Sequence, residues 1–131
     1  MKALLDTHVL LWWLGAPDRL SAEQRAVLEG ASAEHPLLVA EISLWEIAML
    51  ASRGRIRLQL PLQSWLEAAT APPLVRRVGI TPAVAAEVAA LPESFHRDPA
   101  DRVLVATARV LEATLLTCDR RILGAALAAT I

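Results

Sequence analysis

The chain of 131 residues is 55% hydrophobic and 21% charged, which excludes a disordered tail and predicts one packed domain over residues 1–131. No apolar run reaches the roughly 18 residues of a membrane span, and Asp6 comes too early for a secretory signal, so we expect a cytoplasmic protein without membrane contact. The net charge of −1 excludes a global basic field, so any surface for nucleic acid must be local.

The N-terminal third of the chain predicts two strands with a helix between them. Lys2–Leu5 is a short apolar run of strand length. Ser21–Gly30 has helical spacing, and its first residues form the pattern of a capping box. Pro36–Val39 is a second strand-like run.

The middle of the chain predicts a helix and a third strand. Ser43 and Glu46 repeat the capping-box pattern, so we expect a helix to begin at Ser43, and Gly54 would end it as a C-terminal cap. The Pro72-Pro73 pair marks a turn inside the domain, and Leu74–Ile80 follows it as the next strand.

The C-terminal part predicts two further helices and the last strand. Thr81 opens one helix, and Asp98 is expected to cap the other because a proline follows each of them at the first helical position. Thr114–Cys118 is the last strand. Because strand and helix signals alternate, the sequence predicts an α/β fold with a mainly parallel sheet and helices on both faces.

Four acidic residues fall near the ends of these predicted strands. Asp6 and Asp119 directly follow the first and last strands, so both should project at the carboxyl edge of the sheet, where open α/β folds bind ligands. Glu46 and Asp101 lie one turn into the helices beside them. Four carboxylates in one crevice repel one another and need positive charge. Oxygen-only ligands favour one or two Mg²⁺ or Mn²⁺ ions over zinc, and such ions activate water.

Most of these acids also have a structural interpretation. Glu46 could serve the capping box, Asp98 is the better helix cap of its neighbourhood, and Asp101 could only favour the helix dipole. Asp119 could cap a helix that begins just after it. Asp6 has no obvious structural partner in the sequence, so the cluster as a whole indicates more than any member.

Four segments then resemble, in order, the four blocks of PIN-domain ribonucleases, and specifically of the VapC toxins of bacterial toxin–antitoxin pairs. The segments are LLDTHVLLW (residues 4–12), SLWEI (43–47), HRDPADRVLVA (96–106) and LTCD (116–119). Each block alone is a weak signal, but four in this order with an acid in each are specific. One departure is Ala100, which stands where such toxins often carry a bulky aromatic residue.

The resemblance implies a three-layer α/β/α sandwich and an endoribonuclease that depends on Mg²⁺ or Mn²⁺. It implies RNA as substrate, a VapB-type antitoxin as partner, and a homodimer that assembles with the antitoxin into a larger complex. Metal ligation, directly or through water, carries over to the matching acids, Asp6, Glu46, Asp101 and Asp119. Supporting roles carry over to Thr7, Thr117 and Asp98, and Ser43 is expected to support the site from its own block.

Cations and histidines flank the last two acids. One or two of the nearby arginines are expected to contact RNA phosphates; the candidates are Arg97, Arg102, Arg120 and, next in sequence, Arg121. His8 and His96 are left outside the catalytic set, because a lone histidine is more often a hydrogen-bonded structural residue and metal-activated water needs no histidine base.

The sequence also predicts where three tryptophans and the single cysteine lie. Trp12 and Trp13 are successive helix residues that diverge by about 100°, so one of them is expected to cover an interface with an antitoxin or a second copy. Trp45 is expected in the core. Cys118 cannot form an intramolecular disulfide, and it is expected to be a small buried residue.

Two other function classes remain open. A phosphatase or receiver-like α/β domain also gathers acids at strand ends, but here no Asp-x-Asp follows the first strand, and the only lysine, Lys2, follows no late strand. A catalytically silent binding module is the second alternative. The complete set of four acids argues against it, because such a module has no need to keep like charges together.

Overall fold

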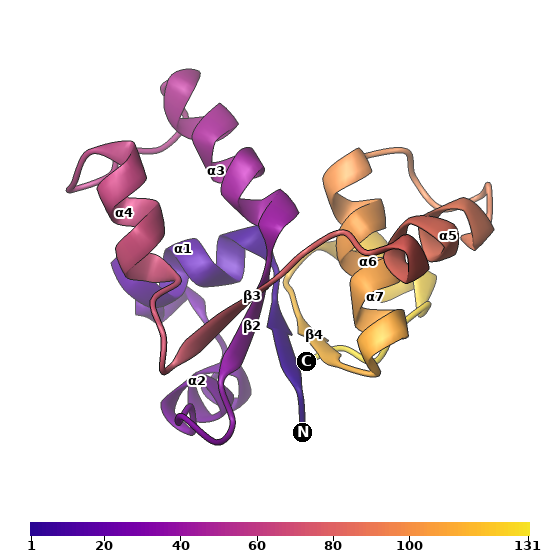
Figure 1. The fold of residues 1–131 in the computed structure, drawn as a ribbon, viewed down its shortest axis with the longest axis horizontal. Coiled ribbons are helices and arrows are strands. Elements are labelled where there is room, and N and C mark those ends of the chain that lie inside the picture. Colours follow the sequence, from indigo (N-terminus) through magenta and orange to yellow (C-terminus); the bar gives the residue numbers. More distant parts are fainter.

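A computed structural model describes residues 1–131 and contains one parallel four-stranded sheet (Figure 1). The strand order is β3-β2-β1-β4. The strands are β1 (Ala3–Leu5), β2 (Leu37–Ala40), β3 (Val75–Val78) and β4 (Thr114–Leu116). All four predicted strands and their parallel pairing are therefore confirmed.

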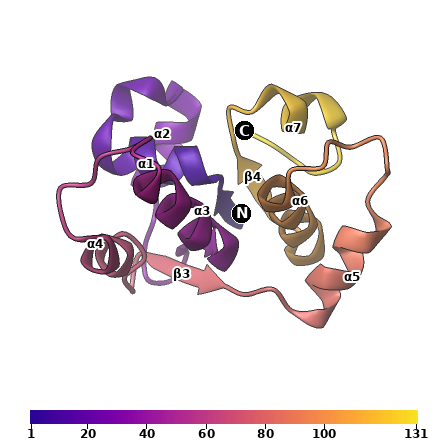
Figure 2. The same cartoon turned by 90° about the horizontal axis from the view of Figure 1, so that it is seen from above.

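Seven α-helices and one 3-10 turn connect the strands. In chain order they are α1 (Thr7–Gly15), the 3-10 turn η1 (Pro17–Arg19), α2 (Ala22–Glu29), α3 (Glu41–Ser52), α4 (Leu62–Ala69), α5 (Pro82–Ala90), α6 (Pro99–Leu111) and α7 (Arg120–Ala125). The view from above shows α1 to α4 on one side of the sheet and α5 to α7 on the other (Figure 2). The predicted α/β/α sandwich is confirmed.

Two hydrophobic clusters lie on the two faces of the sheet, because successive strand residues point to opposite sides. Leu4, Leu38 and Leu115 face α5 to α7. Leu5 and Val39 face α1 to α4. Every residue of β1 and β2 is buried, as expected for the central strands of a sheet covered on both faces.

Helix α3 begins earlier than the sequence predicts. Its N-cap is Ala40, with no capping hydrogen bond from a side chain, so the predicted capping box of Ser43 and Glu46 is wrong. The Ser43 hydroxyl instead accepts a hydrogen bond from Thr7 Oγ1 at 2.9 Å. The capping box at the start of α2 is confirmed, and so is the cap that Asp98 provides for α6.

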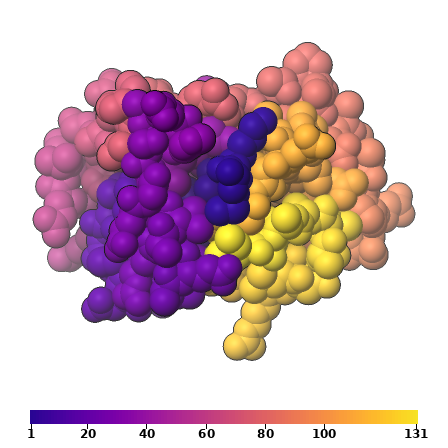
Figure 3. All heavy atoms as spheres, turned by 90° about the horizontal axis from the view of Figure 1, so that it is seen from below, coloured from indigo at the N-terminus to yellow at the C-terminus, as the bar shows by residue number.

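The last residues add to the sheet beside β4. Leu115 N donates to Ala129 O at 2.8 Å, Ile131 N donates to Leu115 O at 3.0 Å, and Thr117 N donates to Ile131 O at 3.1 Å. Gln24 Nε2, which is buried, also donates to Ile131 O. The N-terminus lies at the end of the sheet where the strands begin, in indigo in the view from below (Figure 3), whereas Ile131 lies beside Leu115 and Thr117 at the other end of β4.

Three side-chain predictions are wrong. Trp45 is 54% exposed and does not belong to the core. Trp12 and Trp13 are both half-buried and pack against the same hydrophobic cluster, so the expectation that they cannot share one core is wrong, while their role at an interface stays a prediction. Cys118 is exposed, because the chain has already left β4 when it reaches this residue. No helix is long and apolar enough to cross a membrane.

Candidate active site

The carboxyl ends of the strands open into a cavity of about 280 Å³. Five acids line it: Asp6, Glu46, Asp98, Asp101 and Asp119. They come from the starts of α1, α6 and α7 and from the second turn of α3. The parallel sheet therefore brings together residues that are up to 113 positions apart (119 − 6).

Asp6 is the most deeply buried of the four predicted ligands and is only 5% exposed. It follows β1 directly and is the N-cap residue of α1, but its side chain makes no capping hydrogen bond. Its Oδ2 instead accepts a hydrogen bond from Thr117 Oγ1 at 2.7 Å. Burial raises the pKa of Asp6, and the Thr117 hydroxyl only partly offsets this.

Glu46 lies beside the hydroxyl pair of Thr7 and Ser43. Burial raises its pKa, the Thr7 hydroxyl lowers it, and the negative charges of Asp6 and Asp98 raise it further. The supporting position of the two hydroxyls is set by α1 and α3, whose first turns meet at the sheet edge.

Asp101 is the third residue of α6 and is held by His96. Its Oδ2 lies 2.7 Å from His96 Nε2 and 3.5 Å from the guanidinium of Arg121. Burial raises the pKa of Asp101 to about 6, while the contact with His96 opposes the shift. The other ring nitrogen, His96 Nδ1, is buried without a hydrogen-bond partner.

The pKa of Asp119 shifts in the opposite direction to that of Asp101. Burial disfavours its ionisation, but hydrogen bonds from Arg121 N at 2.8 Å and from the Arg121 guanidinium at 3.4 Å outweigh burial and lower its pKa. A third bond from Ile122 N at 3.3 Å completes an N-cap on α7. The structural role expected for Asp119 is thus present, and the residue lines the cleft as well.

Arg121 supplies positive charge inside this cleft. Its guanidinium contacts Asp101 in α6 and Asp119 at the start of α7. No three acidic, histidine or cysteine side chains in the structure are close enough to one another to bind a single metal ion. The donor set fits a hard divalent cation by its chemistry, because it consists of carboxylates and three of them have raised pKa values.

The other arginines are placed differently from Arg121. Arg97 and Arg120 are exposed and do not line the cleft. Arg102 donates to the backbone carbonyls of Phe95 and His96, so its guanidinium already has partners. His96 is a hydrogen-bonded residue, as the sequence predicts, and its partner is the site acid Asp101, whereas the contact of Arg121 with two acids was not predicted. The one available signal was the position of Arg121 two residues after Asp119, where a side chain at a helix start can reach its own cap.

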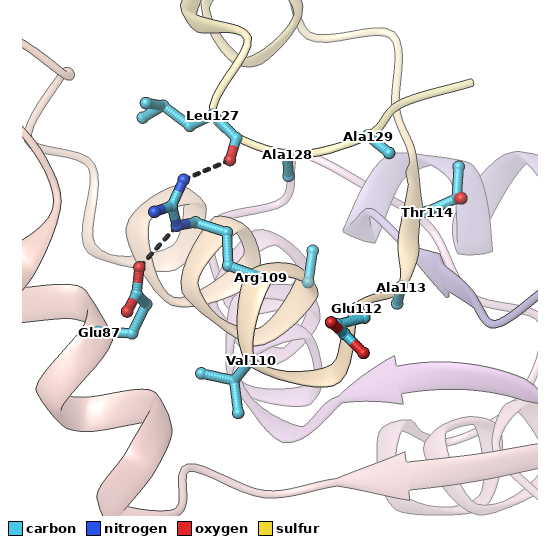
Figure 4. A pocket seen from close by; sticks show the side chains of 10 residues that line it. Glu87, Arg109, Val110, Glu112, Ala113, Thr114, Leu127, Ala128 and Ala129 are labelled. Atoms are coloured by element: carbon cyan, nitrogen blue, oxygen red, sulfur yellow. Dashed lines mark hydrogen bonds and ion pairs between the residues drawn. The ribbon is translucent and has the colours of Figure 1, made fainter.

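Another cavity, of about 520 Å³, lies at the opposite edge of the sheet (Figure 4). It surrounds the end of α6, and Arg109 crosses it to bond Glu87 at 2.6 Å and Leu127 O at 2.6 Å. Its charged side chains also include Glu112, and the rest of the lining is mostly apolar. Because Arg109 and Glu87 form an ion pair with each other, this cavity has no cluster of unpaired charged groups that could act as a catalytic site.

Comparison with known proteins agrees with this geometry. Residues 3–126 match the PIN domain family. The chain is 48% identical over 119 residues to Ribonuclease VapC22 of Mycobacterium tuberculosis, which covers 91% of this chain and 88% of that protein.

Solved structures share the fold at low sequence identity. VapBC2 from Rickettsia felis, bound to a DNA fragment from their promoter, matches with a TM-score of 0.74 and 13% identity, and covers 100% of this chain and 98% of that chain. FitAcB from Neisseria gonorrhoeae matches with a TM-score of 0.69 and 22% identity, over 98% and 96% of the two chains. The similarity to these solved structures shows a shared fold, whereas the family model and the M. tuberculosis relative show the family of this chain. The chain therefore belongs to the PIN-domain family and is of the VapC type.

Proposed function

We propose that this protein is a metal-dependent endoribonuclease and the toxin of a VapBC-type toxin–antitoxin pair. The observation that supports the proposal is the single cleft that five carboxylates line, where burial raises the pKa of three of them. Similarity to a protein named as a ribonuclease supports RNA as the substrate. Membership of the PIN family argues against the phosphatase or receiver-like alternative.

Mg²⁺ or Mn²⁺, as one ion or two, is the proposed cofactor. The residues that would hold it are Asp6, Glu46, Asp101 and Asp119. A raised pKa means that the cleft binds a proton where positive charge is lacking, and a divalent cation replaces that proton. Such an ion supplies an activated water and neutralises the phosphate. No three carboxylates converge in this structure, so an ion here would be held by one or two of them directly and by the others through water.

The surrounding residues hold the four acids in place. Thr117 fixes one oxygen of Asp6, and the hydroxyls of Thr7 and Ser43 lie beside Glu46. Asp98 fixes the first turn of α6, which carries Asp101. With these groups restrained, little conformational freedom is lost when the acids close on a metal and substrate.

Arginines are proposed to contact the RNA backbone near the cleft. Arg97 and Arg120 are exposed and available, and Arg121 already projects into the cleft. For Arg102 to take this role, its guanidinium has to leave the carbonyls of Phe95 and His96. A rim of cations around an acidic, metal-binding centre suits a phosphodiester substrate.

The proposed partners are a VapB-type antitoxin and a second copy of this chain. The structural relatives include VapBC2 from R. felis and a toxin–antitoxin complex from Klebsiella pneumoniae, which matches with a TM-score of 0.66 and 17% identity over 99% of this chain and 96% of that chain. Co-expression with the candidate antitoxin and co-purification of both proteins tests the first of these partners.

The activity is tested with Asp6→Asn and, as a matched control, Asp18→Asn in the exposed turn η1. Cleavage of a structured RNA in Mg²⁺ or Mn²⁺ should fall by about 100-fold or more in Asp6→Asn, because a ligand worth several kcal/mol is lost. EDTA should abolish cleavage by the wild type, and Asp18→Asn should cut normally. Cleavage that persists in Asp6→Asn or in EDTA would rule out the proposed mechanism.

A further inference from the structure

A second cavity of about 340 Å³ adjoins the acidic cleft and lies between α3 and the start of α6. We call it the α3–α6 groove. Its lining residues are Trp45, Glu46, Met49, Leu50, Arg53, Arg55, Asp98, Pro99 and Ala100. The two helices lie side by side in both views of the fold (Figures 1 and 2). Glu46 and Asp98 line both the groove and the cleft, so the two spaces are continuous.

The wall of the groove on α3 is an exposed apolar platform that ends in positive charge. Trp45, Met49 and Arg53 are spaced by four residues and therefore share one face of the helix. Trp45 is 54% exposed although it is the largest side chain on this helix. Trp45, Met49 and Leu50 line the groove together, and a contiguous apolar surface of this kind indicates contact with another molecule.

The end of α3 places a second arginine on the same groove. Gly54 has φ of +68°, a left-handed conformation that favours glycine. The chain therefore turns back, and Arg55 N donates to Leu50 O at 2.9 Å while Gly54 N donates to Ala51 O at 3.1 Å. Arg53 and Arg55 are both exposed, and neither forms an ion pair or a side-chain hydrogen bond.

These features fit a single-stranded nucleic acid better than a protein surface. An aromatic ring on which a base can stack, together with unpaired cations that follow the backbone, is the usual recognition chemistry for single strands. Arg53 and Arg55 have no acidic partner in this chain, and a phosphate backbone supplies the negative charge that they lack. In a nuclease, Glu46 and Asp98 at the end of the groove next to the cleft would serve the metal site, and Arg53 and Arg55 at the other end would bind the phosphates of the substrate.

We propose that the α3–α6 groove binds the single-stranded RNA on one side of the scissile phosphate, with Trp45 as a base-stacking platform and Arg53 and Arg55 as phosphate contacts. The proposal rests on the proposed ribonuclease function, because it names where the substrate of that reaction lies. These three residues are positioning residues and take no part in the chemical step.

The binding test uses a fluorescein-labelled, single-stranded RNA of mixed sequence and the Asp6→Asn protein in Mg²⁺. Trp45→Ala should raise Kd by about 5- to 100-fold, and Trp45→Phe should restore most of the affinity because a phenyl ring still stacks. Arg53→Ala and Arg55→Ala should each reduce the slope of log K against log salt by about 0.7. Arg25→Ala, an exposed arginine on α2, should leave both quantities unchanged.

The kinetic test uses the same substitutions in the otherwise wild-type protein. KM should rise by the factor seen in Kd, and kcat should stay within about twofold, since only ground-state binding is removed. If Kd, salt slope and KM stay at wild-type values while the wild type cuts RNA, the groove proposal is overturned and the proposed function stands. The groove proposal is also overturned if Trp45→Ala alters only the oligomeric state in sedimentation velocity. If the wild type cuts no RNA with either metal, the proposed function fails.

Discussion

Asp6 and Asp119 show how neighbours, and not residue type, decide the charge state of a carboxylate. Asp6 is deeply buried and accepts a side-chain hydrogen bond only from the Thr117 hydroxyl, so burial prevails and its pKa rises. Asp119 receives two backbone N–H bonds and a guanidinium, so its pKa falls. The cleft therefore combines acids that readily accept a proton with one that stays ionised. A bound cation would change the protonation of the first kind most.

The hydroxyl of Thr117 connects two of the site acids. It donates to Asp6 Oδ2 at 2.7 Å and accepts from Asp119 N at 3.0 Å. Thr117→Val keeps the shape but leaves a buried carboxylate oxygen without its donor, so the free energy of unfolding should fall by about 1–3 kcal/mol. Urea denaturation measures this loss. RNA cleavage should fall as well, because Asp6 is no longer oriented.

The control for this prediction is Thr107→Val. Thr107 is equally buried, and its hydroxyl bonds Val103 O within α6, away from the cleft. This variant should cut RNA at the wild-type rate. If the two threonine variants lose the same activity, the decrease reflects general stability and not the site.

Asp101 predicts how stability changes with pH in the absence of metal. Its pKa is raised from 3.8 to about 6 in the folded protein, so the folded state binds the proton more tightly than the unfolded state. This contribution is fully present below about pH 4 and is lost as the pH rises through about 6. Its size is roughly 3 kcal/mol for a shift of about two pH units. Asp6 and Glu46 act in the same direction.

The measurement is urea denaturation in EDTA at pH 5, 6 and 7. The wild type should lose stability between pH 5 and pH 7, and Asp101→Asn, which cannot ionise, should show a smaller loss and be the more stable protein at pH 7. Asp18→Asn should follow the wild type. A pH dependence in Asp101→Asn as steep as in the wild type would contradict the assignment to this residue.

At the scale of the element, the start of α6 depends on Asp98. Its Oδ1 accepts from Ala100 N at 3.0 Å and from Asp101 N at 3.4 Å. Asp98→Ala should lower the free energy of unfolding by about 0.5–2 kcal/mol, whereas Asp98→Asn should have little effect because asparagine caps equally well. Thermal unfolding of the two variants separates the cap from the charge. Equal losses in both would indicate that the charge, and not the cap, stabilises the helix.

Elements with a local signal were predictable from the sequence, and those without one were not. The strands and the starts of α2, α5 and α6 follow from apolar runs, capping residues and prolines. Helix α4 was missed, since Pro61 precedes it and no side chain caps it. The start of α3 was placed too late, because Ala40 at its N-cap carries no signal while Ser43 imitates one.

The candidate site was predictable only in part, because the sequence shows the order of the acids along the chain but not the directions of the side chains. Sequence order shows which acids follow strands, so the gathering of Asp6, Glu46, Asp101 and Asp119 at one edge could be expected. The contact of His96 with Asp101, and the bridge of Arg121 between two acids, depend on side-chain directions that no spacing rule specifies. The exposure of Trp45 was missed because a tryptophan in an apolar helix usually packs inward.

At the scale of the whole molecule, the C-terminal residues support the site from behind. Residues 129–131 make three backbone hydrogen bonds with Leu115 and Thr117, and Thr117 in turn holds Asp6. Deleting these three residues should lower the free energy of unfolding by about 2–4 kcal/mol, because several buried hydrogen bonds are lost. Chemical denaturation checks this value. Leu123→Ala, on the exposed side of α7, should change stability by less than about 0.5 kcal/mol.

The four predicted metal ligands are divided evenly between the two layers of helices. Asp6 and Glu46 belong to α1 and α3 and come early in the chain, whereas Asp101 and Asp119 belong to α6 and α7 and come late. During synthesis the last acid is therefore made long after the first. A chain that is interrupted before Asp119 carries only a partial cluster. For a protein proposed to act as a toxin, this order means that a chain interrupted before Asp119 lacks one of the four proposed metal ligands, and that the full set exists only once α7 has been made.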